Sequence, residues 1–523
     1  MQLEGKSLIA ASSSNTSGQT FHAVNPATSE KLEPAFFSAS ADDVNQAAQA
    51  AHEAFAIYKN VSGHNKGHFL RAIANGLNEA KESIIERAVQ ETALPKPRLE
   101  GELGRTVGQF LAFAELIEEG SWVEARIDHG NAERVPLPKP DLRSMLRPVG
   151  PVAVFGASNF PLAYSVGGGD TASALAAGCP VIVKAHPAHP GTSEIVGRVL
   201  QQAVQECGLP PGVFSLLFDA GYKVGLALVK HPLIKAVGFT GSRRGGRALM
   251  DAAAARPEPI PVYAEMGSIN PVVILPGALN EKSAEIASGL QNSVTLGVGQ
   301  FCTNPGLVFL PQSDEGNQFM DALTQSLKEA APGVMLTEGI SKAYQSGLQK
   351  LEEAGAKNQV RVGASEGQAG AALSETSAAQ LSKKPELMEE VFGPATLVVR
   401  YETSDELREA LQSVEGQLTA TLHATSEELA TNADLVALLE DKAGRLLFGG
   451  FPTGVEVAPS MVHGGPYPAT GDGRSTSVGT RAIFRFVRPV CWQNFPDSAL
   501  PDELKNENPL GIMRLIDGEL ARK

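Results

Sequence analysis

Four short stretches decide the fold of this 523-residue chain, namely VAVFGAS (152–158), PVIVKAH (180–186), VFSLLFD (213–219) and IKAVGFTGS (234–242). Each is an apolar run rich in β-branched residues that ends in small or polar residues. The helical stretches that follow lie at roughly 166–178, 191–207, 222–230 and 243–255. Strands that alternate with helices at this spacing predict βαβ units and a parallel sheet covered on both faces. The fold class is therefore α/β, with a dinucleotide-type domain that lacks the GxGxxG fingerprint.

A second α/β region begins near residue 271. PVVILPGA (271–278) and ATLVVRYE (395–402) predict strands, and residues 363–380 are small and polar, which predicts a surface excursion. Further segments have patterns typical of single elements: helices at 41–92, 98–126, 281–295, 316–330 and 404–413, an edge hairpin at 135–151, and a late strand at 480–492.

Charge and cysteine usage exclude several classes of protein. The chain has 58 acidic and 44 basic residues, a net charge of −14, and no basic cluster, so we expect no nucleic-acid partner. Four cysteines without metal-type spacing favour a reducing compartment, and we expect a cytoplasmic protein. The longest uncharged stretch, 148–169, is interrupted by Pro and Gly, so no membrane segment is predicted.

Cys302 is the first candidate for chemistry. A lone cysteine is more often a small buried hydrophobic residue, which suits Cys179 and Cys207. Cys302 lies in GVGQFCTNPG, among small polar residues and next to a Pro, and this pattern is typical of a turn. Backbone N–H groups in such a turn can hold a thiolate nucleophile.

Three polar side chains in apolar surroundings are further candidates. Glu265, in PVYAEMGSINP, is either half of an ion pair or a general base whose pKa is raised by burial. Asn159, in FGASNFP, is either a turn residue or an amide that stabilises an oxyanion. Glu390 stands beside Phe392 and a Gly–Pro turn.

Two features suit a nucleotide. Lys184 ends a strand at its carboxyl end, where open α/β sheets bind ligands, although a terminal lysine is usually only a solvated charge. GFTGS (238–242) includes Gly241 and Ser242 and precedes a helix, whose first N–H groups can hold a phosphate.

In order and spacing these motifs together resemble the aldehyde dehydrogenase superfamily over essentially the whole chain. The resemblance implies that Cys302 is the nucleophile, Glu265 the general base, and Asn159 an oxyanion donor together with the Cys302 N–H. It also implies that Lys184 and Glu390 contact the cofactor riboses, and Ser242 a phosphate. Because relatives that acylate coenzyme A lack the glutamate, its presence favours hydrolysis of the thioester.

One departure from the family pattern concerns the cofactor. NAD-preferring relatives have a glutamate three residues after the strand-end lysine, whereas this chain has Pro187. We therefore expect NADP to be preferred and NAD to be usable, with His186 adding positive charge and Lys223 contacting a phosphate. The full set expected around the cofactor is Lys184, His186, Lys223, Gly241, Ser242, Glu390 and Phe392.

A second departure concerns the substrate. The segment FPTGVEVAPSMVHGGPYPATGDGRSTSVGT (451–480), with GQFCTNPG, resembles the branch that holds 2-oxoglutarate semialdehyde (2,5-dioxopentanoate) dehydrogenases. A neighbouring branch holds NADP-dependent fatty-aldehyde dehydrogenases, and an inactive relative with a structural role is a third alternative. Phe160 and Arg474 are candidates to contact the substrate, Arg474 because the product is a dianion.

The resemblance also implies domain boundaries. We expect a cofactor-binding domain of residues 1–130 and 151–266 and a catalytic domain of 267–475. Residues 131–150 and 480–495 are expected to pair between subunits of a homodimer or homotetramer, followed by a tail at 496–523. No metal ligand set is predicted.

Overall fold

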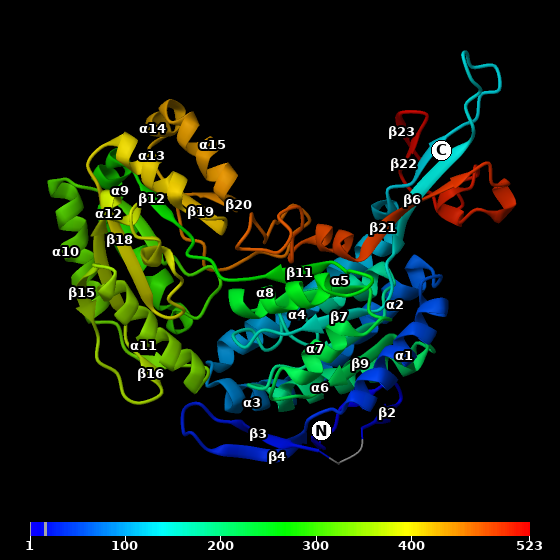
Figure 1. Cartoon of the computed structure of the whole chain (residues 1–523), viewed down its shortest axis with the longest axis horizontal. Coiled ribbons are helices and arrows are strands. Elements are labelled where there is room, and N and C mark those ends of the chain that lie inside the picture. The colour runs from blue at the N-terminus through cyan, green and yellow to red at the C-terminus, as the bar shows by residue number, and fades with distance from the viewer. Residues whose placement is uncertain (1, 15–17, 523) are drawn as a thin grey trace.

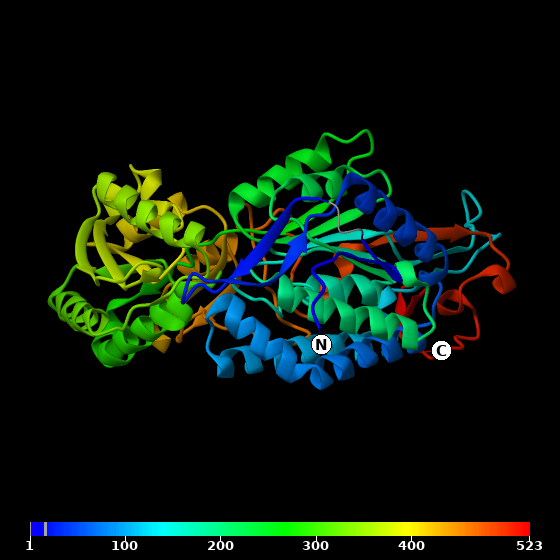
Figure 2. The ribbon, with the colours of Figure 1, turned by 90° about the horizontal axis from the view of Figure 1, so that it is seen from below.

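A computed structural model describes residues 2–14 and 18–522. Within them, two seven-stranded sheets form separate cores, and a five-stranded sheet projects from the end of the molecule opposite the second core (Figure 1). The view from below shows an elongated molecule, with residues from about 270 to 450 gathered at one end (Figure 2).

The first sheet contains the four stretches that decide the fold. The strands from β11 to β9 are parallel, and β1 pairs antiparallel with β9. Across the sheet the strands are β11 (Val262–Glu265), β10 (Ala236–Thr240), β7 (Val152–Phe155), β8 (Val181–Lys184), β9 (Phe214–Leu217), β1 (Leu8–Ile9) and β2 (Ser12–Ser13). The parallel βαβ arrangement predicted from the sequence is confirmed.

Helices cover both faces of this sheet because successive strand residues point to opposite sides. In β7, Val152 and Val154 pack in one apolar cluster, and Ala153 and Phe155 in another. The first cluster is completed by α2 (Gly63–Glu79), α3 (Lys81–Thr92), α4 (Lys96–Glu119), α5 (Gly169–Ala177) and α6 (Pro190–Glu206). The second is completed by α1 (Ala41–Tyr58), α7 (Lys223–Lys230) and α8 (Arg243–Ala254).

The second sheet is parallel except for its edge strand β15, which is antiparallel to β17. Across the sheet the strands are β15 (Lys357–Arg361), β17 (Ala372–Ser377), β18 (Ala395–Tyr401), β13 (Leu307–Pro311), β12 (Val272–Ile274), β19 (Gln417–His423) and β20 (Ala443–Phe448). The helices of this region are α9 (Pro276–Thr295), α10 (Asp314–Lys328), α11 (Glu338–Glu353), α12 (Ala378–Leu381), α13 (Ser404–Ser413), α14 (Ser426–Thr431) and α15 (Ala433–Lys442).

The expected surface excursion at 363–380 is confirmed for the exposed residues 363–366 but is wrong for 372–377. Residues 372–377 form β17, which lies inside the sheet between β15 and β18, and its first three residues are buried. Ala, Ser and Thr have small side chains, which fit the interior of the sheet. A polar composition therefore concealed a buried strand.

The small five-stranded sheet contains the strand expected near residue 480 and two strands from the tail at 496–523. Its order is β21 (Val487–Gln493), β6 (Leu142–Pro148), β5 (Arg126–Asp128), β22 (Arg514–Ile516) and β23 (Glu519–Ala521). The helix expected at 98–126 ends at Glu119, because Gly120 takes a left-handed φ of 86°. The strand expected from residue 480 begins at 487, after the 3₁₀ helix Thr480–Phe486. Two antiparallel two-stranded sheets complete the strands: β3 (Thr20–Val24) with β4 (Lys31–Phe37), and β14 (Gly333–Val334) with β16 (Gln368–Ala369).

Residues 449–479 connect the second sheet back to the first and contain neither a helix nor a regular strand. This segment, orange in Figure 1, runs between the two large cores above β11. An isolated antiparallel bridge joins its Thr470 to Glu265, the last residue of β11. No described helix is long and apolar enough to cross a membrane.

Candidate active site

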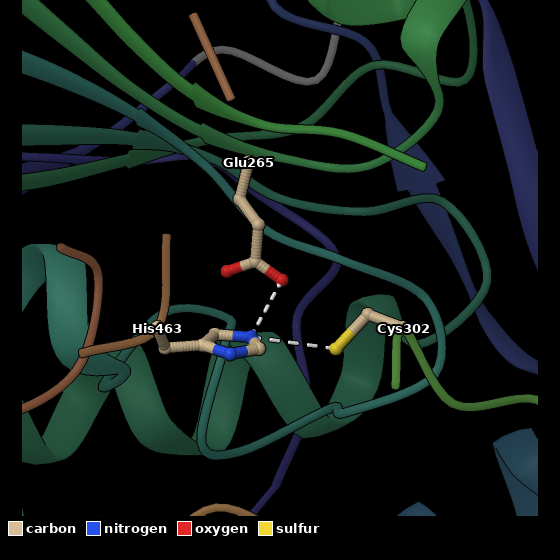
Figure 3. Close-up of side chains that lie close together, drawn as sticks. All are labelled: Glu265, Cys302 and His463. Carbon is tan, nitrogen blue, oxygen red and sulfur yellow. Dashed lines mark hydrogen bonds and ion pairs between the residues drawn. The ribbon is translucent and has the colours of Figure 1, made fainter. Parts of the chain in front are cut away.

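Three side chains from distant parts of the chain meet at the junction of the two large sheets. The imidazole Nε2 of His463 lies 2.9 Å from Oε1 of Glu265 and 3.5 Å from Sγ of Cys302 (Figure 3). The imidazole is completely buried and the Glu265 carboxylate nearly so. A nucleophile, a carboxylate and an imidazole in mutual contact are the components of an activated thiol.

Cys302 lies on an irregular turn between the 3₁₀ helix Leu296–Gly299 and β13. Asn270, on the link between β11 and β12, fixes this turn: its amide donates to the backbone carbonyls of Cys302 and Asn304, each at 2.9 Å. Asn270 itself has a left-handed φ of 48°, which Asn tolerates better than most residues. The two motifs EMGSINP and GQFCTNP are therefore joined by direct hydrogen bonds.

Glu265 ends β11, so its carboxylate lies at the carboxyl edge of the first sheet. Oε2 accepts a hydrogen bond of 2.7 Å from the Ser477 hydroxyl, while Oε1 faces His463. Burial alone would raise the pKa of the Glu265 carboxyl, but the His463 imidazole and the hydrogen bonds from His463 and Ser477 outweigh it and hold the pKa below its usual value. The sequence-based expectation of a raised pKa is thus reversed by these partners, and Glu265 is ionised.

His463 was not singled out by the sequence. It is held by residues thirteen and fourteen positions later: its N–H donates to the Thr476 hydroxyl at 2.8 Å, and its carbonyl accepts from the Ser477 N–H at 2.8 Å. Its Nδ1 is buried without a hydrogen-bond partner among the described residues. A proton on Nδ1 would be unsatisfied, so the geometry assigns the proton to Nε2, which then donates to Glu265.

Burial, reinforced by the neighbouring Glu265 charge, raises the pKa of the Cys302 thiol well above its usual range. The resting nucleophile is therefore a thiol, and a base must remove its proton. The Cys302, Glu265 and His463 ligand atoms lie within 4.8 Å of one another, so these residues can also hold a metal ion, but such an ion would occupy the nucleophile.

Asn159 follows β7 and lies next to the Cys302 turn. Its buried amide donates to the carbonyl of Gln300 at 3.0 Å, which leaves a second amide hydrogen. The structure therefore brings the expected oxyanion donor to the nucleophile's own turn.

The Lys184 side chain at the end of β8 is buried, and no described residue forms a hydrogen bond or ion pair with its ammonium group. Burial lowers the pKa of Lys184 to about 8, against the opposing effect of the Asp219 carboxylate. A buried ammonium without a protein partner fits a ligand hydroxyl or phosphate at this strand end. Asp219, which the sequence did not single out, ends the β9 segment and accepts from the N–H groups of Gly221 and Val224.

His186 does not supply the expected positive charge. Burial, with the nearby His189 and Lys184, lowers the pKa of His186 well below its usual value, so the ring is neutral near pH 7. Its ring stacks on His189 at 5.5 Å, and its Nδ1 accepts from the Ala188 N–H. Positive charge at this strand end therefore rests on Lys184.

The other residues expected at the cofactor have varied surroundings. Ser242 is the N-cap of α8, where its hydroxyl accepts from the Gly245 N–H, and Gly241 donates its N–H to the Glu265 carbonyl. Glu390 accepts from the Ser268 N–H at 3.4 Å, and a Cβ on Gly267 would lie 2.2 Å from its Oε2. Lys223 is exposed at the start of α7, and Phe392 is half-buried.

The two substrate candidates differ sharply. The Phe160 ring meets the Tyr164 and Phe301 rings edge-on, each at 5.3 Å, and forms an apolar wall with Val455 and Val457. Arg474, in contrast, has a side chain that is 92% exposed, and it pairs with Asp472. No contact of Arg474 links it to Cys302 among the described residues.

Comparison with known proteins agrees with this geometry. The aldehyde dehydrogenase family model matches residues 13–456. The chain is 51% identical to alpha-ketoglutaric semialdehyde dehydrogenase 2 of Azospirillum brasilense, over 99% of this chain and all of that protein. It is 45% identical to alpha-ketoglutaric semialdehyde dehydrogenase of Acinetobacter baylyi, over 99% of each chain.

Solved structures share the fold at lower identity. Betaine aldehyde dehydrogenase from Staphylococcus aureus, in complex with NAD⁺, is 20% identical and superposes with a TM-score of 0.80 over 94% of this chain and 95% of its own. Aldehyde dehydrogenase C from Pseudomonas syringae is 23% identical, with a TM-score of 0.79 over 95% and 98% of the two chains. The full-length relatives and the matching family model establish that this chain belongs to the aldehyde dehydrogenase family.

Proposed function

We propose that the protein oxidises 2-oxoglutarate semialdehyde (2,5-dioxopentanoate) to 2-oxoglutarate with NAD(P) as hydride acceptor and a thioester on Cys302 as intermediate. The observation that carries the proposal is the contact between the Cys302 thiol, the His463 imidazole and the Glu265 carboxylate. The names of the two full-length relatives support this choice of aldehyde.

The first step needs a base for the thiol. Ionised Glu265, whose carboxylate lies within 4.8 Å of the Cys302 sulfur, takes the thiol proton, while the Nε2–H of His463 holds the carboxylate and stabilises the developing thiolate. Attack on the aldehyde carbon forms a C–S bond and a thiohemiacetal oxyanion. The free amide hydrogen of Asn159 and the Cys302 N–H would donate to that oxyanion.

Bound NAD(P) would supply the hydride acceptor, so that loss of hydride from the thiohemiacetal would leave a thioester on Cys302. Glu265, once it is deprotonated again, removes a proton from water as the water attacks the thioester carbon. The acid leaves and the thiol is restored. On the protein side, the partnerless Lys184 ammonium and Glu390, which folds over Gly267, are the groups that would hold the cofactor.

NADP is proposed as the preferred cofactor, with NAD usable. The absence of a carboxylate at Pro187 removes repulsion of a 2′-phosphate, and Lys184 and exposed Lys223 are the available cations. Asp219 adds a negative charge near Lys184 and opposes this preference. The ratio of kcat/KM for NADP and NAD, in the wild type and in Lys223→Ala, tests the proposal, because the substitution should weaken NADP more than NAD.

A homo-oligomer is proposed from the small sheet, in which β21 is an edge strand with alternating exposed residues. We also propose a cytoplasmic location, since all four cysteines, each within the described residues, are free thiols. Light scattering of the purified protein, and fractionation of cells that produce it, test these two points.

The apolar wall around Phe160 favours a second candidate, an NADP-dependent dehydrogenase of fatty aldehydes, because an apolar chain would be buried there. The deciding experiment follows the absorbance of the reduced cofactor with 2,5-dioxopentanoate or hexanal, in the wild type and in Cys302→Ser. Higher kcat/KM with the dioxo acid supports the proposal, and higher kcat/KM with hexanal replaces it with the second candidate. Turnover that persists in Cys302→Ser would contradict both, and no turnover with any aldehyde would favour an inactive relative.

A further inference from the structure

We propose that Arg98 binds the carboxylate of the substrate, which lies at the opposite end of the substrate from its aldehyde group. The inference rests on the proposed function, because it requires a substrate that carries an anion. Arg98 would then set the preference for acidic over apolar aldehydes. Neither the sequence motifs nor the resemblance indicated this side chain.

Arg98 lies in the first turn of α4, and its guanidinium is packed between two aromatic rings. The guanidinium carbon is 5.1 Å from the centre of the Phe160 ring and 4.8 Å from the centre of the Phe301 ring. In the sequence these rings are the immediate neighbours of Asn159 and Cys302. The guanidinium therefore packs on the two rings that are next in sequence to the proposed oxyanion donor and to the proposed nucleophile.

The hydrogen bonds of Arg98 are incomplete. Nη2 donates to the backbone carbonyl of Asn159 at 2.8 Å, whereas Nη1 is buried and has no partner among the described residues. A buried N–H group of a cation without an acceptor is costly, so native proteins usually supply one. A bound anion would provide the missing acceptor.

Glu102, one helical turn further along α4, interacts electrostatically with this cation but forms no described ion pair with it. One Glu102 oxygen accepts from the N–H groups of Leu162 and Ala163, so the Nη1 of Arg98 is still without an acceptor among the described residues. Gly297 packs closely against the guanidinium, since a Cβ there would be 3.1 Å from Nη1 and 2.6 Å from the Phe301 ring. A planar carboxylate is the acceptor that a guanidinium binds best.

Two other arginines near this wall use their terminal nitrogens to hold the chain, although the Nε of Arg445 is buried without a partner among the described residues. Arg105 donates to the Val455 carbonyl and to the Tyr164 hydroxyl. Arg445 donates from Nη1 to the Gly454 carbonyl at 3.0 Å and from Nη2 to the Pro452 carbonyl at 2.6 Å. Both therefore fix residues 452–455 of the connecting segment, and Arg98 is better suited than either to bind a ligand.

This arrangement explains how a wall of aromatic rings can select an acid. The methylene groups of the dioxo acid would pack along Phe160 and Phe301, and its carboxylate would reach Arg98. An apolar aldehyde of the same length would gain the same packing but would leave the buried Nη1 without an acceptor. A site with an unsatisfied polar group discriminates strongly against the ligand that lacks the partner.

The test compares wild type, Arg98→Gln and Arg98→Lys with 2,5-dioxopentanoate and with hexanal. Arg361→Gln is the control, since it removes an exposed guanidinium that pairs with Glu352 on the second sheet. Loss of a charge-assisted hydrogen bond predicts that Arg98→Gln lowers kcat/KM for the dioxo acid about 10- to 100-fold, mainly through KM, with little change for hexanal. Arg98→Lys should recover part of the loss.

A structural role would give a different result. If Arg98 only braces the Asn159 carbonyl, Arg98→Gln lowers kcat equally for both aldehydes, and the inference is overturned while the proposed function stands. If the wild type itself prefers hexanal, the proposed function fails first. Product inhibition by 2-oxoglutarate is the independent readout: its inhibition constant should rise in Arg98→Gln and stay unchanged in Arg361→Gln, and an unchanged constant in Arg98→Gln also overturns the inference.

Discussion

Replacement of His463 should slow the enzyme and move its pH profile. The imidazole donates to an ionised, buried carboxylate at 2.9 Å and lies 3.5 Å from the nucleophile. A hydrogen bond to a charged group contributes about 1.5–3 kcal/mol. If that contribution is lost at the transition state, kcat falls about 10- to 150-fold. The expected order of activity is wild type, then His463→Gln, whose amide N–H can replace the donor, then His463→Ala.

The pH dependence follows from the sign of the pKa shift. His463 is one of the groups that hold the pKa of Glu265 below its usual value, whereas burial acts in the opposite direction. Without the imidazole, burial dominates and the pKa of Glu265 rises. Glu265 acts as a base only when it is ionised. As the pH is lowered, the His463→Ala variant should therefore lose activity at a higher pH than the wild type does.

The assay is kcat and kcat/KM for 2,5-dioxopentanoate between pH 5 and 9, with the absorbance of the reduced cofactor as signal. His64→Gln, which removes an exposed histidine on α2, is the control and should match the wild type. Circular dichroism checks that each variant is folded. A folded His463→Ala with wild-type kcat and an unmoved acid limb would refute the role assigned to the imidazole.

Three further predictions concern residues that surround the site. Because burial and Glu265 raise the pKa of Cys302, the resting thiol should react slowly with iodoacetamide near pH 7 and faster as the pH rises; rapid labelling at pH 7 without cofactor, measured by mass spectrometry against Cys302→Ser, would contradict this. Asn270→Ala should lower stability by at least about 2 kcal/mol in urea denaturation and reduce kcat, because the carbonyls of Cys302 and Asn304 lose their shared donor, and an unchanged urea midpoint would show that the turn holds without it. Lys184→Met should raise the KM for the cofactor but stabilise the cofactor-free protein by roughly 3 kcal/mol at pH 7, because a fall in pKa from 10.5 to about 8 means that folding disfavours the charged form. Because the pKa of Lys184 is lower in the folded state, the unfolded wild type binds more protons than the folded state between pH 8 and 10.5. The stability of the wild type should therefore rise with pH over that window, while that of Lys184→Met does not. The same dependence of the melting temperature on pH in both proteins would count against this reasoning.

Local patterns identified the first sheet with little error. The helices expected at 191–207 and 243–255 lie at Pro190–Glu206 and Arg243–Ala254, because amphipathic spacing and apolar strands are properties of neighbouring residues. The pattern failed where burial did not follow hydrophobicity. In β17, Ser374 and Thr376 are buried inside the second sheet, which their composition concealed.

The chemistry of the site divides in the same way. Cys302 and Glu265 stand in short motifs whose neighbours mark them as unusual, so the sequence sufficed to predict them as the nucleophile and the base. His463 and Arg98 stand in unremarkable surroundings. His463 is 198 residues from Glu265 and 161 residues from Cys302, and it lies beyond the residues that the family model matches.

The sequence by itself thus determined the α/β class and the family, and it predicted the nucleophile and the base, since each depends on short motifs. Tertiary structure alone decided the charges and hydrogen bonds: it lowers the pKa of Glu265, raises that of Cys302, lowers that of His186, and leaves the Nη1 of Arg98 without an acceptor among the described residues. The physical reason is that ionisation and hydrogen bonding depend on burial and on groups that fold in from distant segments. A motif can name a titratable residue, but only its packed surroundings set its protonation and its partner.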